Sequence, residues 1–238
     1  MPHRVQLPSA RSCCRWLRDG DGKRVYSARM PLPNDPPQSP LLQPEPPLRP
    51  ALPRIPFVEC RNWQRGALRH KVDLIVLHCM EGDEALYRAE RCAAWMAGED
   101  APKSSAHYFV DGDSIVQGVH DECIAWHAPG ANNNGIGIEH AGKAKQTREE
   151  WLDTNGVPMF DLSAQLTASL CLKWQIPVVY VNAEDLLAKP QLRGITTHNE
   201  VTKAFKRSTH TDPGKGFPID WYLARVLKYV VQPPAGIV

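Results

Sequence analysis

This 238-residue sequence lacks several features that would define its class directly. No apolar stretch approaches the roughly 20 residues that span a membrane, so we expect no stable membrane association. The N-terminal stretch MPHRVQLPSARSCCRWLRDG has no apolar core of a Sec signal peptide, which predicts synthesis in the cytoplasm without Sec export. The net charge is only +2 and the basic residues form no stripe, which argues against a nucleic-acid partner.

The cysteines also lack the spacing of a structural metal site. There are seven, an odd number, and no two of them form a CxxC pair. Several lie in apolar runs, where a free thiol behaves as a small apolar side chain. We therefore expect reduced cysteines. Since a compact zinc motif such as HExxH is absent as well, a metal site would need ligands from distant parts of the chain.

Proline, in contrast, is abundant and concentrated in one segment. Half of the 22 prolines lie between Pro31 and Pro56. Because proline has no backbone N–H to donate, residues 31–56 are predicted to form an extended linker rather than a helix or sheet. Residues 1–30 are basic and weakly patterned, which fits either a short accessory piece or a disordered one. The remaining chain then comprises one domain at 57–232 and a tail at 233–238.

Strands are indicated by apolar runs after residue 57. The continuous run VDLIVLHC at 72–79 is typical of a strand buried on both faces. AHYFVDGDSIVQGV at 106–119 predicts a hairpin around its Asp-Gly turn. GIGIEHAG at 135–142 predicts another short strand, and PVVYV at 177–181 is compatible with one.

Helices alternate with these strands. Residues 83–99 carry apolar side chains at helical spacing, namely Leu86, Ala89, Ala93 and Met96. Residues 161–176 show the same period after a capping Asp or Ser, and 219–231 form a closing amphipathic helix. The alternation predicts an α/β fold with a central mixed β-sheet flanked by helices.

Two histidines and one aspartate, far apart in the chain, are candidate metal ligands. His78 ends the first predicted strand, where a covered sheet exposes side chains to a cleft. His198 lies in the β-like segment GITTHNEV, and Asp212 lies at the Asp-Pro-Gly turn of RSTHTDPGKGFPI. Taken alone, each histidine could also be a hydrogen-bonded residue of the core, and the aspartate could simply stabilise the turn. Together they form a three-ligand set, which for zinc leaves a fourth position for water.

Glu139 is the candidate general base. It lies in the apolar strand at 135–142, where a carboxylate is costly unless it is paired or functional. Alternation places Glu139 on the face opposite Ile138 and His140, so Glu139 and His140 should not share a role. A glutamate beside an activated water is what a metal-dependent hydrolase needs.

The loop before this strand carries the candidate substrate contacts. Trp126, His127 and Asn134, in AWHAPGANNN, would line a polar cleft, although Trp126 and His127 fit the anchoring of a loop equally well. His107, in the predicted hairpin, fits a structural role. Cys79 should be a buried thiol that points away from the histidine before it.

Five motifs in this order resemble the zinc N-acetylmuramoyl-L-alanine amidases of the type-2 family. They are IVLHCM, SSAHYFVDGDSIVQGV, AWHAPGANNNGIGIE, TTHNEV and HTDPGKGFPIDW. The family includes phage lysozyme-type amidases, muropeptide-recycling amidases and the peptidoglycan recognition proteins. The resemblance covers about residues 72–230. It implies this family's fold, one Zn2+ per chain, peptidoglycan as partner, and hydrolysis of the amide between N-acetylmuramic acid and L-alanine.

The resemblance also implies roles for individual residues. His78 and His198 match the two zinc histidines, and Asp212 matches a third ligand that is Asp in some members and Cys in others. Glu139 matches the acidic residue that activates water in the recycling-type branch. Members without this glutamate use a tyrosine before the hairpin histidine, a position that Ala106 holds here.

His210 departs from the family pattern, which usually has a lysine two positions before the third ligand. A protonated imidazole could stabilise an oxyanion as that lysine does, but the ordinary histidine pKa is only about 6.5. A neutral His210 could still donate one N–H. Alternatively, His210 could bind zinc in place of Asp212.

The implied function is that of a phage or prophage endolysin, which acts on the cell wall after release from the cytoplasm. The proline-rich extension favours this over a cytoplasmic muropeptide-recycling amidase, which needs no wall-targeting piece. A non-catalytic peptidoglycan-binding module, a zinc hydrolase of another bond and a structural zinc protein are rival functions. The complete ligand set together with Glu139 favours the amidase.

Overall fold

The computed structural model describes most of the chain after residue 51. The described residues are 16–18, 24–26, 52–65, 71–189 and 191–232. Most of the predicted linker at 31–56 and all of the predicted tail at 233–238 lie outside them. Among the described helices, none combines the length and apolar character needed to cross a bilayer.

The chain divides into two compact units, Met1–Pro46 and Pro47–Val238. In the first, β1 (Trp16–Arg18) and β2 (Arg24–Tyr26) form an antiparallel pair. The rest of the predicted N-terminal piece lies outside the described residues.

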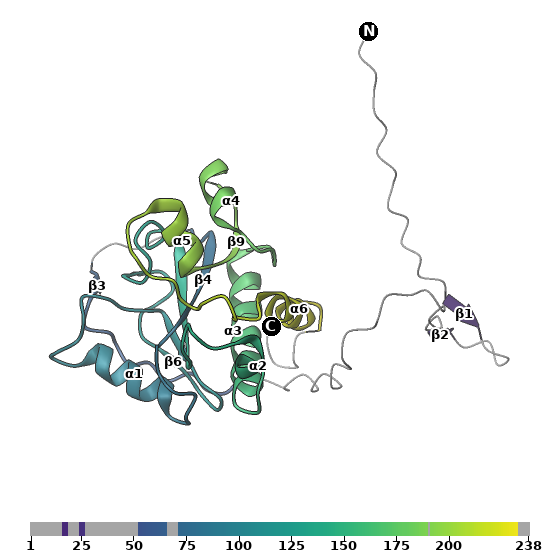
Figure 1. Ribbon diagram of the computed structural model, residues 1–238, viewed down its shortest axis with the longest axis horizontal. Helices are drawn as coiled ribbons and strands as arrows, with labels where there is room; N and C mark the ends of the chain where they lie inside the picture. Colours follow the sequence, from purple (N-terminus) through teal and green to yellow (C-terminus); the bar gives the residue numbers. More distant parts are fainter. Residues whose placement is uncertain (1–15, 19–23, 27–51, 66–70, 190, 233–238) are drawn as a thin grey trace, which may run out of the picture. The chain divides into compact units, whose positions relative to one another are not determined.

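The second unit is built on a five-stranded sheet of order β6-β5-β8-β4-β9 (Figure 1). Its strands are β4 (Leu74–Cys79), β5 (Tyr108–Val110), β6 (Ile115–Gln117), β8 (Gly135–His140) and β9 (Gly194–Thr197). β4 pairs in parallel with β8 and β9, and β5 pairs in parallel with β8. Only β6 runs antiparallel to its neighbour β5 within this sheet. The mixed sheet, the buried strand and the hairpin expected from the sequence are therefore confirmed.

Helices cover both faces of this sheet (Figure 1). On one face, Ile75, Leu77 and Ile138 pack with α3 (Gly156–Trp174) and α6 (Ile219–Val231). On the other, α1 (Arg88–Ala97) packs on the β5–β6 hairpin, and α5 (His198–Phe205) packs on β4. The described part of the unit also contains four short elements: β3 (Trp63–Gln64), β7 (Ile124–Ala125), α2 (Arg148–Trp151) and α4 (Ala183–Ala188). The central sheet flanked by helices is thus the predicted fold.

The start of α1 differs from the prediction. The helix begins at Arg88, so Leu86 precedes it and is 57% exposed, whereas Ala89, Ala93 and Met96 are buried as expected. The backbone N–H of Ala89 donates to the Asp111 carboxylate, 3.0 Å away in the β5–β6 turn. Asp111 thus satisfies one of the free backbone amides at the start of the helix. The spacing of apolar residues in the sequence cannot show a hydrogen-bond partner that lies 22 residues away.

The start of α3 and the segment PVVYV also differ. α3 begins at Gly156, and neither Asp161 nor Ser163 caps it, because both side chains lie within the helix and face buried partners. PVVYV forms only an isolated bridge, from Tyr180 to Ile195. The closing helix occupies the predicted residues.

A buried ion pair joins α3 to α6. The Arg225 guanidinium donates to Asp161 over 2.5 Å, and the two side chains are 3% and 6% exposed. α6 also carries an exposed pair of the same residue types, in which Arg148 donates to Asp220 over 2.6 Å with side chains 43% and 72% exposed. The two pairs therefore allow the stabilising effect of a buried Arg–Asp ion pair to be compared with that of an exposed one.

We predict that Arg225→Met lowers the free energy of unfolding by about 3–5 kcal/mol, because it leaves a carboxylate buried without its counter-ion. Arg148→Met should cost less than about 1 kcal/mol, since water screens that pair. Urea unfolding of the metal-free protein measures both. Equal, small losses for the two variants would contradict a structural role for the buried pair.

Candidate metal centre

The topology brings two histidines to one edge of the sheet. β4 and β9 are adjacent and parallel, so their carboxyl ends meet at the same edge. His78 lies near the end of β4. His198 directly follows β9 as the first residue of α5, not as part of a β-like segment, because the Thr197 hydroxyl accepts the Glu200 N–H and caps the helix.

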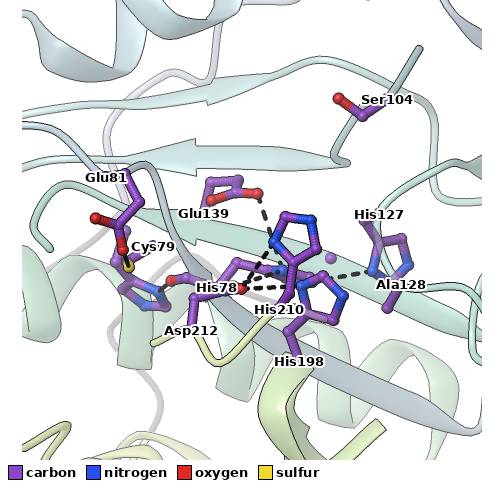
Figure 2. A network of polar contacts seen from close by, with 12 residues as sticks. His78, Cys79, Glu81, Ser104, His127, Ala128, Glu139, His198, His210 and Asp212 are labelled. Atoms are coloured by element: carbon purple, nitrogen blue, oxygen red, sulfur yellow. Dashed lines mark hydrogen bonds and ion pairs between the residues drawn. The ribbon is translucent and has the colours of Figure 1, made fainter. Parts of the chain in front are cut away.

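Asp212 reaches the same point from the loop after α5. The backbone N–H of Asn199 donates to the Asp212 carbonyl over 2.9 Å, which ties this loop to the first turn of α5. The Asp212 carboxylate then lies between the two rings (Figure 2). Its Oδ2 is 3.1 Å from His78 Nδ1, and its Oδ1 is 3.1 Å from His198 Nδ1.

The three side chains are buried, and this burial determines their charge. Burial alone would raise the pKa of Asp212, but the adjacent rings of His198 and His78 outweigh it and hold the pKa well below its usual range. Burial lowers the pKa of His78, although Asp212 opposes this shift. The site therefore favours a carboxylate facing a neutral imidazole, the protonation states that a metal ligand needs.

This geometry fits a zinc ion. One candidate ligand atom from each of His78, His198 and Asp212 lies within 4.8 Å of the others. In a tetrahedral site with zinc–nitrogen and zinc–oxygen bonds of about 2.0–2.1 Å, ligand atoms are about 3.3 Å apart. Asp212 Oδ1 is buried and makes no hydrogen bond of good geometry with the described residues, although His198 Nδ1 is 3.1 Å away. The two atoms face each other as two ligands of one cation would.

Glu139 lies beside this cluster on the same face of the sheet. It is the register partner of His78 in the parallel β4–β8 pair, and its Oε1 is 3.9 Å from His78 Nδ1. Burial, followed by the nearby Asp212 and Glu81 charges, raises the pKa of Glu139 well above its usual range. Its buried Oε2 has no hydrogen-bond partner among the described residues, so the carboxylate is available to a ligand.

His140, the next residue, points to the opposite face, as alternation predicts. Its Nδ1 donates to the His78 carbonyl over 2.9 Å, and its Nε2 lies 2.7 Å from the Ser163 hydroxyl of α3. Cys79 is likewise buried in the core on the α3 side, facing away from the cluster. Glu139 and His140 therefore do not share a role.

A cavity of about 710 Å³ opens over the cluster, and its lining decides which further residues a ligand meets. Trp126 and His127 line it, as expected, and so does Trp95 on α1, which the sequence did not single out. Both indoles are exposed. The signal in the sequence that could have identified Trp95 was an aromatic residue on the polar side of a predicted helix. Asn134 is not part of the described lining, whereas Asn132 is, and its Oδ1 also accepts the N–H of His127.

His210 lies at the rim of the cluster. Its side chain is 67% exposed, and its ring stacks on His198 with centroids 4.7 Å apart and planes 15° apart. Its Nδ1 is 3.5 Å from Asp212 Oδ1. Asp212, rather than His210, lies between the two buried histidines (Figure 2).

Fold and site together define an α/β protein with three candidate metal ligands gathered in an open cavity at one edge of a mixed sheet. A family model described as N-acetylmuramoyl-L-alanine amidase matches residues 68–215. The chain belongs to the N-acetylmuramoyl-L-alanine amidase family.

Individual relatives agree with this assignment. N-acetylmuramoyl-L-alanine amidase A of Achromobacter lyticus is 34% identical over 107 residues, which are 44% of this chain and 54% of that protein. The match thus spans about half the length of this curated relative. The solved structure of the Staphylococcus aureus hydrolase AmiA with its ligand superposes with a TM-score of 0.57 at 18% identity, over 76% of this chain and 85% of that one. At that identity the likeness establishes a shared fold.

We predict that Asp212→Asn weakens zinc binding by more than about 100-fold, beyond the loss typical of residues that only support a ligand. His210→Asn should change it by less than about 10-fold, since this ring lies outside the three-ligand cluster. Competition with a chelator of known zinc affinity measures both. A greater loss for His210→Asn than for Asp212→Asn would show that His210 is the third ligand.

Proposed function

We propose that this protein is a zinc-dependent amidase that hydrolyses the amide between the lactyl group of N-acetylmuramic acid and the L-alanine of the peptidoglycan stem peptide. Family membership supports the reaction class. The observation that carries the proposal is the Glu139 carboxylate, one oxygen of which has no hydrogen-bond partner within the described part of the chain and lies beside two buried candidate metal ligands in an open cavity. His78, His198 and Asp212 would hold the zinc ion.

Glu139 would act as the general base and then as the general acid. When bound, zinc supplies Lewis-acid activation of a water molecule and of the scissile carbonyl. Because the pKa of Glu139 is raised, its carboxylate is a stronger base than an ordinary glutamate. It would take a proton from the attacking water and pass it to the leaving nitrogen of L-alanine.

His210 and the two tryptophans would act on the substrate. His210 is exposed at the rim, where one ring N–H can be donated to the carbonyl oxygen as negative charge develops. Trp126 and Trp95 present apolar ring faces to the cavity, which suit the faces of sugar rings. His127 also lines the cavity, but both of its ring nitrogens lie within hydrogen-bond distance of protein groups, so it would meet a substrate through its ring carbons.

We further propose that residues 57–232 form the catalytic domain and that residues 1–30 and 31–56 are an accessory piece and its linker, with a tail at 233–238. Such an extension suits attachment to the cell wall, which favours an endolysin over a muropeptide-recycling enzyme. A non-catalytic peptidoglycan-binding module would need no base, and Glu139 Oε2, which has no hydrogen-bond partner among the residues that the structure describes, argues against such a module.

Glu139→Gln should lower kcat by about 10²–10⁴-fold, the usual contribution of a general base, while zinc affinity changes little. Release of stem peptides with new L-alanine amino termini, followed by mass spectrometry, measures the rate. Glu81→Gln is a matched control, since this carboxylate also lines the cavity but accepts the Ala144 N–H at 2.9 Å. A rate for Glu139→Gln within a few-fold of wild type would overturn the assignment of the base.

The biological setting is tested with two substrates. An endolysin should release stem peptides from intact cell-wall sacculi at least as well as from small soluble muropeptides. Full-length protein and both substrates at equal concentrations of cleavable amide give the ratio of rates. Turnover of soluble muropeptides alone would instead identify a recycling amidase, and tight binding to sacculi without any turnover would identify a binding module.

A further inference from the structure

His127 lines the cavity and also contacts His78, a candidate zinc ligand. Its Nδ1 is 3.1 Å from His78 Nε2, and its own Nε2 is 3.1 Å from the Gly135 carbonyl (Figure 2 shows the first contact). Two imidazoles and one carbonyl therefore form a continuous chain that ends at a candidate zinc ligand. The reaction described above does not use this chain.

The carbonyl fixes where the protons lie along this chain. A carbonyl oxygen only accepts, so His127 Nε2 must carry a hydrogen. A neutral imidazole carries one ring hydrogen, so a His127 ring with that hydrogen on Nε2 presents Nδ1 as an acceptor. His78 Nε2 then carries the hydrogen that it donates to His127. Without a metal, His78 Nδ1 faces the Asp212 carboxylate at 3.1 Å, where a ring N–H can be donated; with zinc bound, Nδ1 would supply its lone pair to the ion.

We propose that His127 is a positioning residue for zinc: together with the Gly135 carbonyl it holds His78 in the Nε2–H tautomer, whose free Nδ1 can bind the ion. This inference rests on the proposed zinc site. The nitrogen that binds a metal is set by the hydrogen bond that the other ring nitrogen makes. Here that partner is another imidazole.

The surrounding residues hold the His127 ring in place. Asn132 Oδ1 accepts the backbone N–H of His127 at 3.0 Å and that of Ala128 at 2.7 Å, which fixes the loop. The ring lies over Gly137 of β8, where a Cβ would come within 2.6 Å of His127 Cγ. His107 packs against it edge-on, with ring centroids 5.5 Å apart. The space left by Gly137 is thus filled by the ring that supports His78.

The histidine itself offers a matched pair of test variants. An asparagine oxygen can take the place of Nδ1, so His127→Asn keeps the acceptor for His78 and loses the donor to Gly135. A glutamine amide nitrogen can take the place of Nε2, so His127→Gln keeps that donor and loses the acceptor. If His127 only filled space, His127→Asn, which has the shorter side chain, would not bind zinc more tightly than His127→Gln.

We expect His127→Asn to keep zinc affinity within about fivefold of wild type, and His127→Gln and His127→Leu to weaken it by roughly 10–100-fold. Chelator competition with zinc alone measures this, and thermal unfolding of each metal-free variant checks its folding. His120→Asn serves as a control, because this exposed ring stacks on Phe57, with centroids 4.2 Å apart, and does not line the cavity. Equal losses for His127→Asn and His127→Gln would overturn the proposal.

The tautomer is also measured directly in the wild type. Long-range proton–nitrogen correlation spectra of metal-free protein at about pH 8 should show His78 protonated at Nε2 and His127 unprotonated at Nδ1. A proton on His127 Nδ1 with a bare His78 Nε2 would contradict the positioning role. These spectra do not depend on catalysis, so a protein that binds zinc but releases no stem peptides would refute the proposed function while the spectra still decide the role of His127.

Discussion

The structure depends on one buried carboxylate that two imidazoles face from either side. Asp212 is ionised between His78 and His198, although burial opposes its charge. A carboxylate in this position is unfavourable unless a cation or ordered donors compensate for lost hydration. Parallel pairing of β4 with β9 brings the two histidines to one edge, and the Asn199 N–H holds the Asp212 loop against α5. The cluster of candidate metal ligands is therefore a consequence of topology, not of a compact motif.

β8 shows how one strand serves both the site and the core. Gly137 and Glu139 face the site, where the glycine leaves space for His127 and the glutamate stands beside His78. Ile138 and His140 face α3 and α6, and His140 supports the His78 backbone from that side. A shift of one residue in the β4–β8 register would exchange these faces, so the parallel register keeps the proposed base, Glu139, apart from the core.

Much of the fold could be predicted from the sequence, because strong local patterns determine it, and five ordered motifs indicated the candidate site residues. The apolar run of β4 and the period of α6 placed those elements, and alternation alone separated Glu139 from His140. Other features depend on tertiary contacts without a local signal. Asp111 satisfies the start of α1, Asp161 pairs with Arg225 instead of capping α3, and His198 begins a helix because Thr197 caps it. The motif around His127 marked this residue as a candidate substrate contact. The positioning role proposed for it could be inferred only once the structure placed the Gly135 carbonyl beside its ring.

Anomalous diffraction at the zinc edge, from crystals of the full-length protein grown with zinc, tests the metal centre most directly. We expect one anomalous peak, about 2.0–2.1 Å from His78 Nδ1, His198 Nδ1 and one carboxylate oxygen of Asp212. Glu139 should lie beside the ion without binding it. A peak bound through His210 in place of Asp212, or no peak at this edge of the sheet, would contradict the three-ligand zinc site.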